Sequence, residues 1–253
     1  MADIYNDSWR DVDKAFKSTC RVIFGKEEGG INELEPYLRE YTEPLKDTKS
    51  INGKDVYYTA PYCESARFLS YDESFDSVSK PININSIKDI DSLLNAVREN
   101  AHYTGNKILG NSNFVEQSEN VIDSSFVYRS SEILRCEYVA HSSLIRDSKY
   151  MFGSSCLGTS SFCIKSCEAC FSQRCFETNI LFYCSDAFYS NNCKSCHEIL
   201  FCFDQVSKRH MIGNNELGKE RYGEIKGRIV EQILDELRSK RSVPSLLDLV
   251  KGD

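Results

Sequence analysis

The chain has 253 residues, of which 41% are hydrophobic and 27% charged, and its formal net charge is −7 at neutral pH. This composition is typical of a folded soluble protein with one large domain or two smaller ones. The acidic excess is dispersed, which argues against non-specific binding to nucleic acid and to anionic membrane surfaces. No stretch approaches the roughly 20 apolar residues of a membrane span. We therefore expect no nucleic-acid partner and no membrane association.

The N-terminal residues and the cysteines point to a reducing compartment. The stretch "MADIYNDSWRDVDK" lacks the basic-then-apolar order of a secretory signal, and the chain contains 12 cysteines. Without such a signal, most thiols are expected to be free. We predict a cytoplasmic protein. We also predict no cofactor, because "GKEEGG" lacks the Lys-Ser/Thr pair of a phosphate-binding loop.

Residues 1–105 carry no repeat and are predicted to form a small α/β region. Apolar residues at helical spacing predict a helix in "NDSWRDVDKAFKSTCRVIF" and a shorter one in "INELEPYLREY". Asn52-Gly53 in "KSINGKDVYYT" is typical of a hairpin with a type I′ turn. "ARFLSYDE" predicts a strand and "DIDSLLNAVRENAHY" an amphipathic helix. We expect this region to cover the first coil of the repeat that follows, because an open solenoid end presents unpaired strand edges.

A six-residue repeat begins at Ser112. Stepping by six from Ser112 to Cys202 meets only Ser, Thr or Cys, and the register three residues later is apolar from Val115 to Met211, with Gln205 as its exception. A helix has a period of 3.6 and a flat strand alternates, so neither fits. A β-solenoid fits, because its coils stack about 4.8 Å apart and align equivalent residues. We expect the small residues near corners, with hydroxyls bonded to the backbone of their own or the next coil.

The outward residues set the coil length. Phenylalanine and tyrosine recur 12 residues apart at Phe114, Phe126, Tyr138, Tyr150 and Phe162. Hexads with a ring at this position therefore alternate with hexads that lack one. A three-sided coil would not produce this alternation. We predict a mostly β protein. Its centre is a narrow β-solenoid over 106–214, with about eight or nine flat, two-sided coils of about 12 residues each. An N-terminal α/β capping region occupies 1–105, and an amphipathic C-terminal helix and tail occupy 215–253.

One side of this solenoid is expected to carry an aromatic ladder, because the neighbours of an inward residue point outward. The predicted interaction face consists of Phe126, Tyr128, Tyr138, Tyr150, Phe152, Phe162, Phe176, Phe188 and Leu200. Monomers rarely leave so much apolar surface exposed. The cover is the chain's own helices, a second copy or another protein, and these three alternatives stay open.

The C-terminal region offers one of these covers. "NELGKERYGEIKGRIVEQILDELRSK" carries an apolar stripe at helical spacing. The predicted helix either caps the last coil or lies on the aromatic face. The tail "SVPSLLDLVKGD" either docks on its own chain or serves as a peptide ligand for a partner.

Residues 195–225, "SCHEILFCFDQVSKRHMIGNNELGKERYGEI", close the repeat with cysteines, an aromatic-rich coil and a helix start. This pattern resembles uncharacterised cysteine-rich β-solenoid repeat proteins of microbial genomes. The resemblance covers the solenoid and its closing helix, and this chain departs from it by having Ser where such proteins have Cys. It implies a fold and no activity.

The cysteines suggest a metal site at first sight, because Cys167-x-x-Cys170 and Cys193-x-x-Cys196 resemble two zinc knuckles. The repeat offers another explanation. Cys193 falls on an inward apolar position and Cys196 on a small one, where free cysteine acts as a small hydrophobe. We predict no metal. The candidate ligands for the alternative are Cys184, Cys193, Cys196 and Cys202.

Two function hypotheses follow. The first is a non-enzymatic structural or assembly protein that binds itself or a protein partner through the aromatic face, as a homodimer or as a subunit of a larger complex. The alternative is a cysteine-rich metal-binding or enzymatic module that uses the coils. His141 or His197 would then be the candidate base, by analogy with hexapeptide-repeat acyltransferases. No catalytic residue is assigned.

Overall fold

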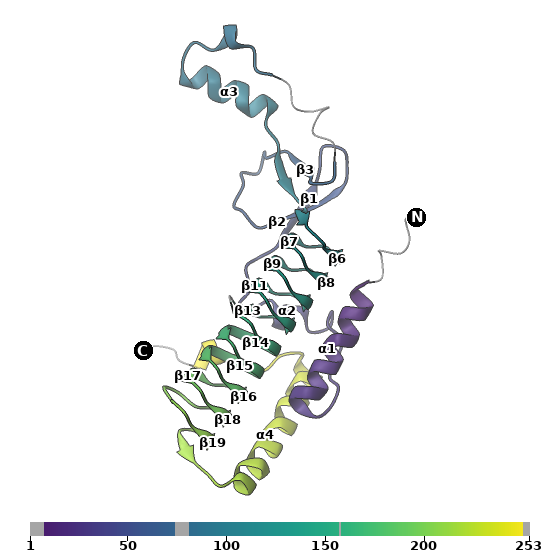
Figure 1. Cartoon of the computed structure of the whole chain (residues 1–253). Coiled ribbons are helices and arrows are strands. Elements are labelled where there is room, and N and C mark those ends of the chain that lie inside the picture. The colour runs from purple at the N-terminus through teal and green to yellow at the C-terminus, as the bar shows by residue number, and fades with distance from the viewer. Residues whose placement is uncertain (1–7, 74–80, 157, 250–253) are drawn as a thin grey trace.

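The computed structural model describes residues 8–73, 81–156 and 158–249. A parallel β-solenoid of about nine coils forms the centre of the protein (Figure 1). Strands on one side are β6 (Asn113–Glu116), β8 (Ser125–Tyr128), β10 (Glu137–Ala140), β12 (Lys149–Phe152), β14 (Ser161–Cys170), β15 (Gln173–Phe182), β16 (Ser185–Phe188), β18 (His197–Leu200) and β19 (Arg209–Ile212). Strands on the other side are β5 (Ile108–Leu109), β7 (Glu119–Ile122), β9 (Ser131–Leu134), β11 (Ser143–Arg146), β13 (Ser155–Cys156) and β17 (Asn191–Lys194), while β14 and β15 run through both sides.

The register of the strands confirms the predicted coil of about 12 residues. Val139 pairs with Val127 on one neighbouring strand and with Met151 on the other. The same column continues through Cys163 and Cys175. Inward residues of successive coils therefore stack in columns, as the hexad pattern predicts. The last strand, β20 (Asn215–Glu216), turns back antiparallel to β19.

The coils bend at residues in the left-handed conformation, which the sequence pattern did not reveal. One coil has four of them: Phe126 (φ 57°), Arg129 (φ 47°), Glu132 (φ 56°) and Arg135 (φ 53°). Nearly every third residue from Phe114 to Gly213 has the same left-handed conformation. This conformation costs a non-glycine residue about 1 kcal/mol. Hydrogen bonds between coils compensate, because the Arg129 and Arg135 N–H groups donate to carbonyls 13 residues earlier.

The small residues of the hexads bond the coils to one another, as predicted. The Ser130 hydroxyl donates to the Tyr128 carbonyl (2.9 Å) and accepts from the N–H of Ser142, one coil later (3.2 Å). Ser142 repeats both contacts, with the Ala140 carbonyl and the Ser154 N–H. Each hydroxyl thus satisfies one buried donor and one buried acceptor, which a narrow coil cannot leave unpaired.

Two long helices lie along one side of the solenoid (Figure 1). Helix α1 (Ser8–Phe24) and helix α4 (Lys219–Lys240) share one apolar core with the strands of that side. The Phe16 ring of α1 meets Phe152 edge to face at 5.2 Å. Ile233 and Leu234 of α4 are buried in the same core. The predicted C-terminal helix therefore lies on the aromatic face, and the short helix α2 (Glu35–Leu38) closes the core beside it.

The remaining N-terminal elements lie at the β6 end of the solenoid (Figure 1). They are β1 (Lys46–Lys49), β2 (Asp55–Tyr58), β3 (Phe68–Ser70), the 3₁₀ turn η1 (Ile84–Ser86), α3 (Ile90–Asn100) and β4 (Tyr103–Gly105). Asn106 joins them to the coils, since its side chain bonds the Tyr57 N–H and the Asp55 carbonyl. Within residues 8–73 and 81–105, α1 and α2 thus pack along the side of the solenoid, and the later elements lie at its end.

The predicted hairpin forms, but with a different turn. β1 and β2 pair antiparallel, and Gly53 has φ 86°. A type I′ turn would also need a positive φ at Asn52. Asn52 is not among the residues of the described chain that have a positive φ. Gly53 N–H instead donates to the Ser50 carbonyl and Ser50 N–H to the Lys54 carbonyl, so the loop is longer than two residues.

Helix α3 begins at a capping box, in which Asp89 and Ser92 bond each other's backbone. None of its residues is buried. Short helix α5 (Leu246–Leu249) differs, because Leu246 and Val243 before it are buried against the chain. The tail therefore docks intramolecularly over 243–249. In the described segments no helix combines the length and apolarity that crossing a bilayer requires.

Candidate functional site

Most of the predicted interaction face is covered by the chain's own helices. Five of its nine residues are at most 7% exposed beneath α1, α2 and α4: Tyr128, Phe152, Phe176, Phe188 and Leu200. The prediction that these five present a surface to a partner is wrong. The reason is that α1 and α4 each carry an apolar stripe long enough to cover this side of the coils.

The other four residues, Phe126, Tyr138, Tyr150 and Phe162, are only partly buried. Together with Phe114 they form a stack of rings that we name the aromatic corner. Successive ring centroids are 4.7, 4.7, 4.9 and 4.6 Å apart, and successive planes differ by 15° or less. The left-handed backbone of each residue turns its ring out of the strand and toward the edge of α1.

A groove of about 330 Å³ separates the aromatic corner from α1. Its helical wall is formed by Asp11, Lys14, Ala15 and Ser18. Lys14 and Asp11 pair with each other (2.8 Å) and remain largely exposed. The groove therefore offers ring edges on one side and a polar helix edge on the other.

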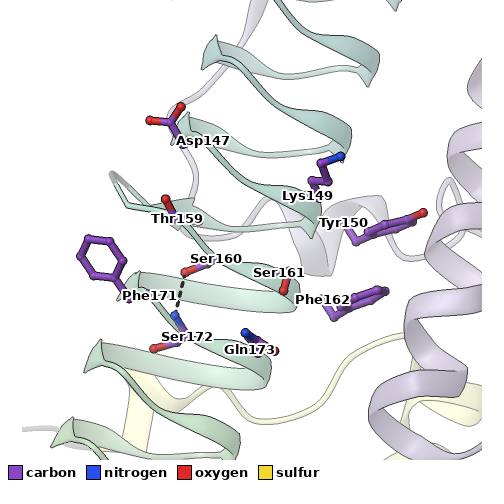
Figure 2. Close-up of a pocket in the computed structure, with 10 residues that line it drawn as sticks. All are labelled: Asp147, Lys149, Tyr150, Thr159, Ser160, Ser161, Phe162, Phe171, Ser172 and Gln173. Atoms are coloured by element: carbon purple, nitrogen blue, oxygen red, sulfur yellow. Dashed lines mark hydrogen bonds between the residues drawn. The ribbon is translucent and has the colours of Figure 1, made fainter.

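A second hollow, of about 520 Å³, lies on the other side of the corner (Figure 2). We name it the polar trough. Tyr150 and Phe162 lie at one end of it and Phe171 at the other, with their rings pointing in opposite directions. The full set of lining residues is Asp147, Lys149, Tyr150, Thr159, Ser160, Ser161, Phe162, Phe171, Ser172 and Gln173.

The trough exists because one column of corner residues carries aromatic rings in some coils and no ring in the coil of Thr159. Phe171 stacks on Tyr183, one coil later, at 5.0 Å and 9°. One coil earlier the same column holds Thr159, which has no ring, so the second face of Phe171 is left without a stacked partner. Phe171 is accordingly 50% exposed. Its signal in the sequence was the 12-residue spacing to Tyr183, which the sequence analysis did not use.

The charged groups of the trough are already paired. Lys149 Nζ lies 2.8 Å from Glu137, and both oxygens of Asp147 accept from Arg135, at 2.6 and 2.8 Å. In contrast, Thr159, Ser161 and Gln173 make no side-chain hydrogen bond to another residue in the described part of the chain. The trough is thus neutral, with uncommitted polar groups between aromatic rings.

The metal candidates do not form a coordination site. Across residues 8–73, 81–156 and 158–249, no three Cys, His, Asp or Glu side chains converge on a possible ion. The Cys184 thiol instead donates to the Cys193 carbonyl and accepts from the Cys196 N–H, both at 3.4 Å, and Cys202 donates to the Leu200 carbonyl (3.4 Å). Burial raises the pKa of Cys184 to about 11 and that of Cys193 to about 12. Cys184, Cys196 and Cys202 thus replace serine hydroxyls between the coils, and Cys193 belongs to the inward apolar column.

The two candidate histidines lie in different surroundings. His141 is 1% exposed, and burial lowers its pKa to about 3. His197 Nδ1 lies 2.5 Å from the Ser185 hydroxyl, a pairing that suits a nucleophile and a base. However, the Ser185 N–H donates to the Cys196 carbonyl. This N–H is therefore not free to stabilise an oxyanion.

Lys165 and Glu177 form a buried ion pair on adjacent coils, with Nζ and Oε1 3.4 Å apart and both side chains 2% exposed. Glu177 also accepts from the Tyr37 hydroxyl (2.5 Å), the Ser245 hydroxyl (3.0 Å) and the Leu246 N–H (3.1 Å). All these partners belong to the chain. The cluster therefore holds α2 and the C-terminal tail against the solenoid and offers no room for a ligand.

Comparison of the chain with family models, with curated proteins and with solved structures gives no match. The aromatic corner and the polar trough are two features of the surface that local packing does not explain.

Proposed function

We propose that this protein is a non-enzymatic solenoid scaffold that self-associates through its aromatic corner. The observation that carries the proposal is the row of stacked, partly exposed rings with a spacing near 4.7 Å. A second copy presents the same spacing, so two corners match ring for ring under two-fold symmetry. Such self-complementarity is what a homodimer interface requires.

The size of the corner limits the expected affinity. A stable interface removes roughly 800 Å² from each partner, which is more than the edges of five rings supply. The exposed flank of α1, with Asp11 and Lys14, must therefore contribute to the interface. We expect a reversible dimer with a Kd in the micromolar range, which corresponds to roughly −8 kcal/mol.

Sedimentation velocity between about 1 and 100 µM tests the proposal with matched variants. Tyr138→Arg places a charge in the middle of the corner and should keep the protein monomeric. Phe182→Arg is the control, because Phe182 is 41% exposed and lies outside the corner. It should dimerise like the wild type. A wild-type protein that is monomeric throughout, or a dimer that Tyr138→Arg leaves intact, would contradict the proposal.

A further inference from the structure

We propose that the polar trough is a binding site for a neutral oligosaccharide, with one sugar ring stacked on Phe171. This site goes beyond the proposed self-association. It shares Tyr150 and Phe162 with the aromatic corner, but Phe171 and Gln173 lie outside that corner. The reasons lie in the aromatic rings, the uncommitted polar groups, the pairing of the charges and the geometry of the trough.

The first reason is the free face of Phe171. A saccharide ring has an apolar C–H face, and it packs against an aromatic ring without polar groups being buried unpaired. Phe171 offers that face, because Thr159 one coil earlier leaves it uncovered and Tyr183 supports it from the other side at 5.0 Å. Tyr150 and Phe162 bound the other end of the trough (Figure 2).

The second reason is the set of polar groups between these rings. Hydroxyls of Thr159 and Ser161 both donate and accept, and the Gln173 amide donates and accepts through different atoms. Sugar hydroxyls need this combination, because each of them also donates and accepts. Ser160 and Ser172 are unavailable, since their hydroxyls donate to the Ala169 and Cys170 carbonyls.

The third reason is that the trough lacks the groups that other classes of ligand would need. A phosphate or nucleic acid would need uncompensated cations, but Lys149 is paired with Glu137. A peptide added as a strand would need free backbone groups. The N–H groups of Lys149, Ser161 and Gln173 all donate to carbonyls of the next coil, at 3.0–3.1 Å. A neutral, hydroxyl-rich ring is the class that these features favour.

The fourth reason is geometric. The lining residues come from three successive coils, at 147–150, 159–162 and 171–173, and coils stack roughly 4.8 Å apart. A sugar ring stacked on Phe171 would therefore fill the space, one coil high, that Thr159 leaves between Phe171 and the coil of Asp147. The volume of about 520 Å³ also falls within the range of small-ligand sites.

Saturation-transfer NMR and calorimetry with cellotetraose, chitotetraose and mannotetraose test the proposal on the full chain. At least one of these should bind the wild type with a Kd of about 0.1–1 mM, as expected for a shallow site. Phe171→Ala should weaken that binding about fivefold to tenfold, by loss of the stacking, and Gln173→Ala should also weaken it.

Two controls separate this proposal from self-association. Tyr138→Arg should abolish the dimer and retain the sugar, and Phe182→Ala should retain both. Circular dichroism of every variant checks that the solenoid is folded. Failure of all three neutral oligosaccharides to bind, binding that Phe171→Ala leaves unchanged, or binding of only an anionic heparin tetrasaccharide would overturn the proposal.

Discussion

At the scale of single residues, the small position of each hexad explains why serine and cysteine alternate freely in this chain. Its side chain accepts from a backbone N–H one coil later and donates to a carbonyl of its own coil, as Ser130 does. A thiol fulfils the same two roles at longer distances, as Cys184 does with the Phe182 carbonyl (3.5 Å) and the Cys196 N–H (3.4 Å). This equivalence explains Cys196 of the apparent zinc knuckle, whereas Cys193 occupies the inward apolar column of Leu181.

Replacing Ser130 tests that role. Ser130→Ala should lower the free energy of unfolding by about 1–3 kcal/mol, because the buried N–H of Ser142 loses its acceptor. Ser130→Cys should cost less, because the sulfur still accepts. Urea denaturation followed by circular dichroism measures both variants. An alanine variant as stable as the cysteine variant would show that the hydroxyl is not a needed acceptor.

His141 is the residue with the largest expected effect of pH. Burial lowers its pKa to about 3, and the charges of Arg39 and Arg129 act in the same direction, while Glu35 lies 4.0 Å from Nδ1. In the unfolded chain the pKa is about 6.5. Unfolding therefore takes up a proton below pH 6.5. The contribution of this group to stability is complete above that pH and is lost as the pH falls toward 3.

Between about pH 6.5 and 4.5, this effect should remove about 2 kcal/mol of stability. His141→Gln should flatten that dependence, because glutamine does not titrate. His102→Gln is the matched control and should keep the wild-type slope. Urea midpoints at three pH values across this window provide the measurement. Equal slopes in the wild type and His141→Gln would rule out His141 as the cause.

At the scale of elements, the amphipathic helices divide into those that find a partner within the chain and one that does not. Helix α1 buries Val12, Phe16 and Cys20 on the coils. In contrast, α3 has a similar apolar stripe but none of its residues is buried. The stripe predicts the helix in both cases. It does not predict the contact, because that depends on where the loops place each helix.

Two substitutions in α1 measure how much its packing on the solenoid contributes to stability. Phe16→Ala should destabilise the protein by about 3–5 kcal/mol, since Phe16 is 1% exposed and packs on Phe152. Val22→Ala on the same helix should change stability by less than about 0.5 kcal/mol, because Val22 is 43% exposed. If the two variants unfold at the same urea concentration, α1 does not contribute the expected core.

At the scale of the whole molecule, the solenoid isolates its thiols from solvent. Of the 12 free cysteines, Cys63 is exposed, Cys167 and Cys170 are intermediate, and the others are buried. Burial raises the pKa of Cys20 to about 12 and that of Cys136 to about 11. Burial limits access to these thiols, and the raised pKa disfavours the thiolate form that reacts with disulfide reagents.

A disulfide reagent that reports released thiolate should therefore label one cysteine rapidly in the native protein, and all 12 after denaturation. Cys63→Ser should remove the rapid phase without affecting the slower ones. Several cysteines reacting at the rate of Cys63 would mean that the coils open readily, which the stacked columns do not lead us to expect.

The hexad pattern alone predicts the solenoid, its 12-residue coil and the inward columns. These depend on a local pattern that every hexad repeats from Ser112 onward, so each copy reinforces the same register. It also identified the rings at Phe126 and Tyr138. The left-handed corners stayed hidden, because residues as different as Phe126, Arg129 and Glu132 adopt them.

The periodic pattern leaves open which rings are covered and which remain at the surface. Phe152 follows an inward residue and Phe162 precedes one, so the pattern points both outward, but Phe152 is buried beneath α1 and Phe162 stays at the edge of the polar trough. The physical reason is that covering depends on contacts between segments far apart in the chain, such as Phe16 and Phe152. Those contacts follow from the paths of loops and the lengths of helices, and no periodic pattern encodes them.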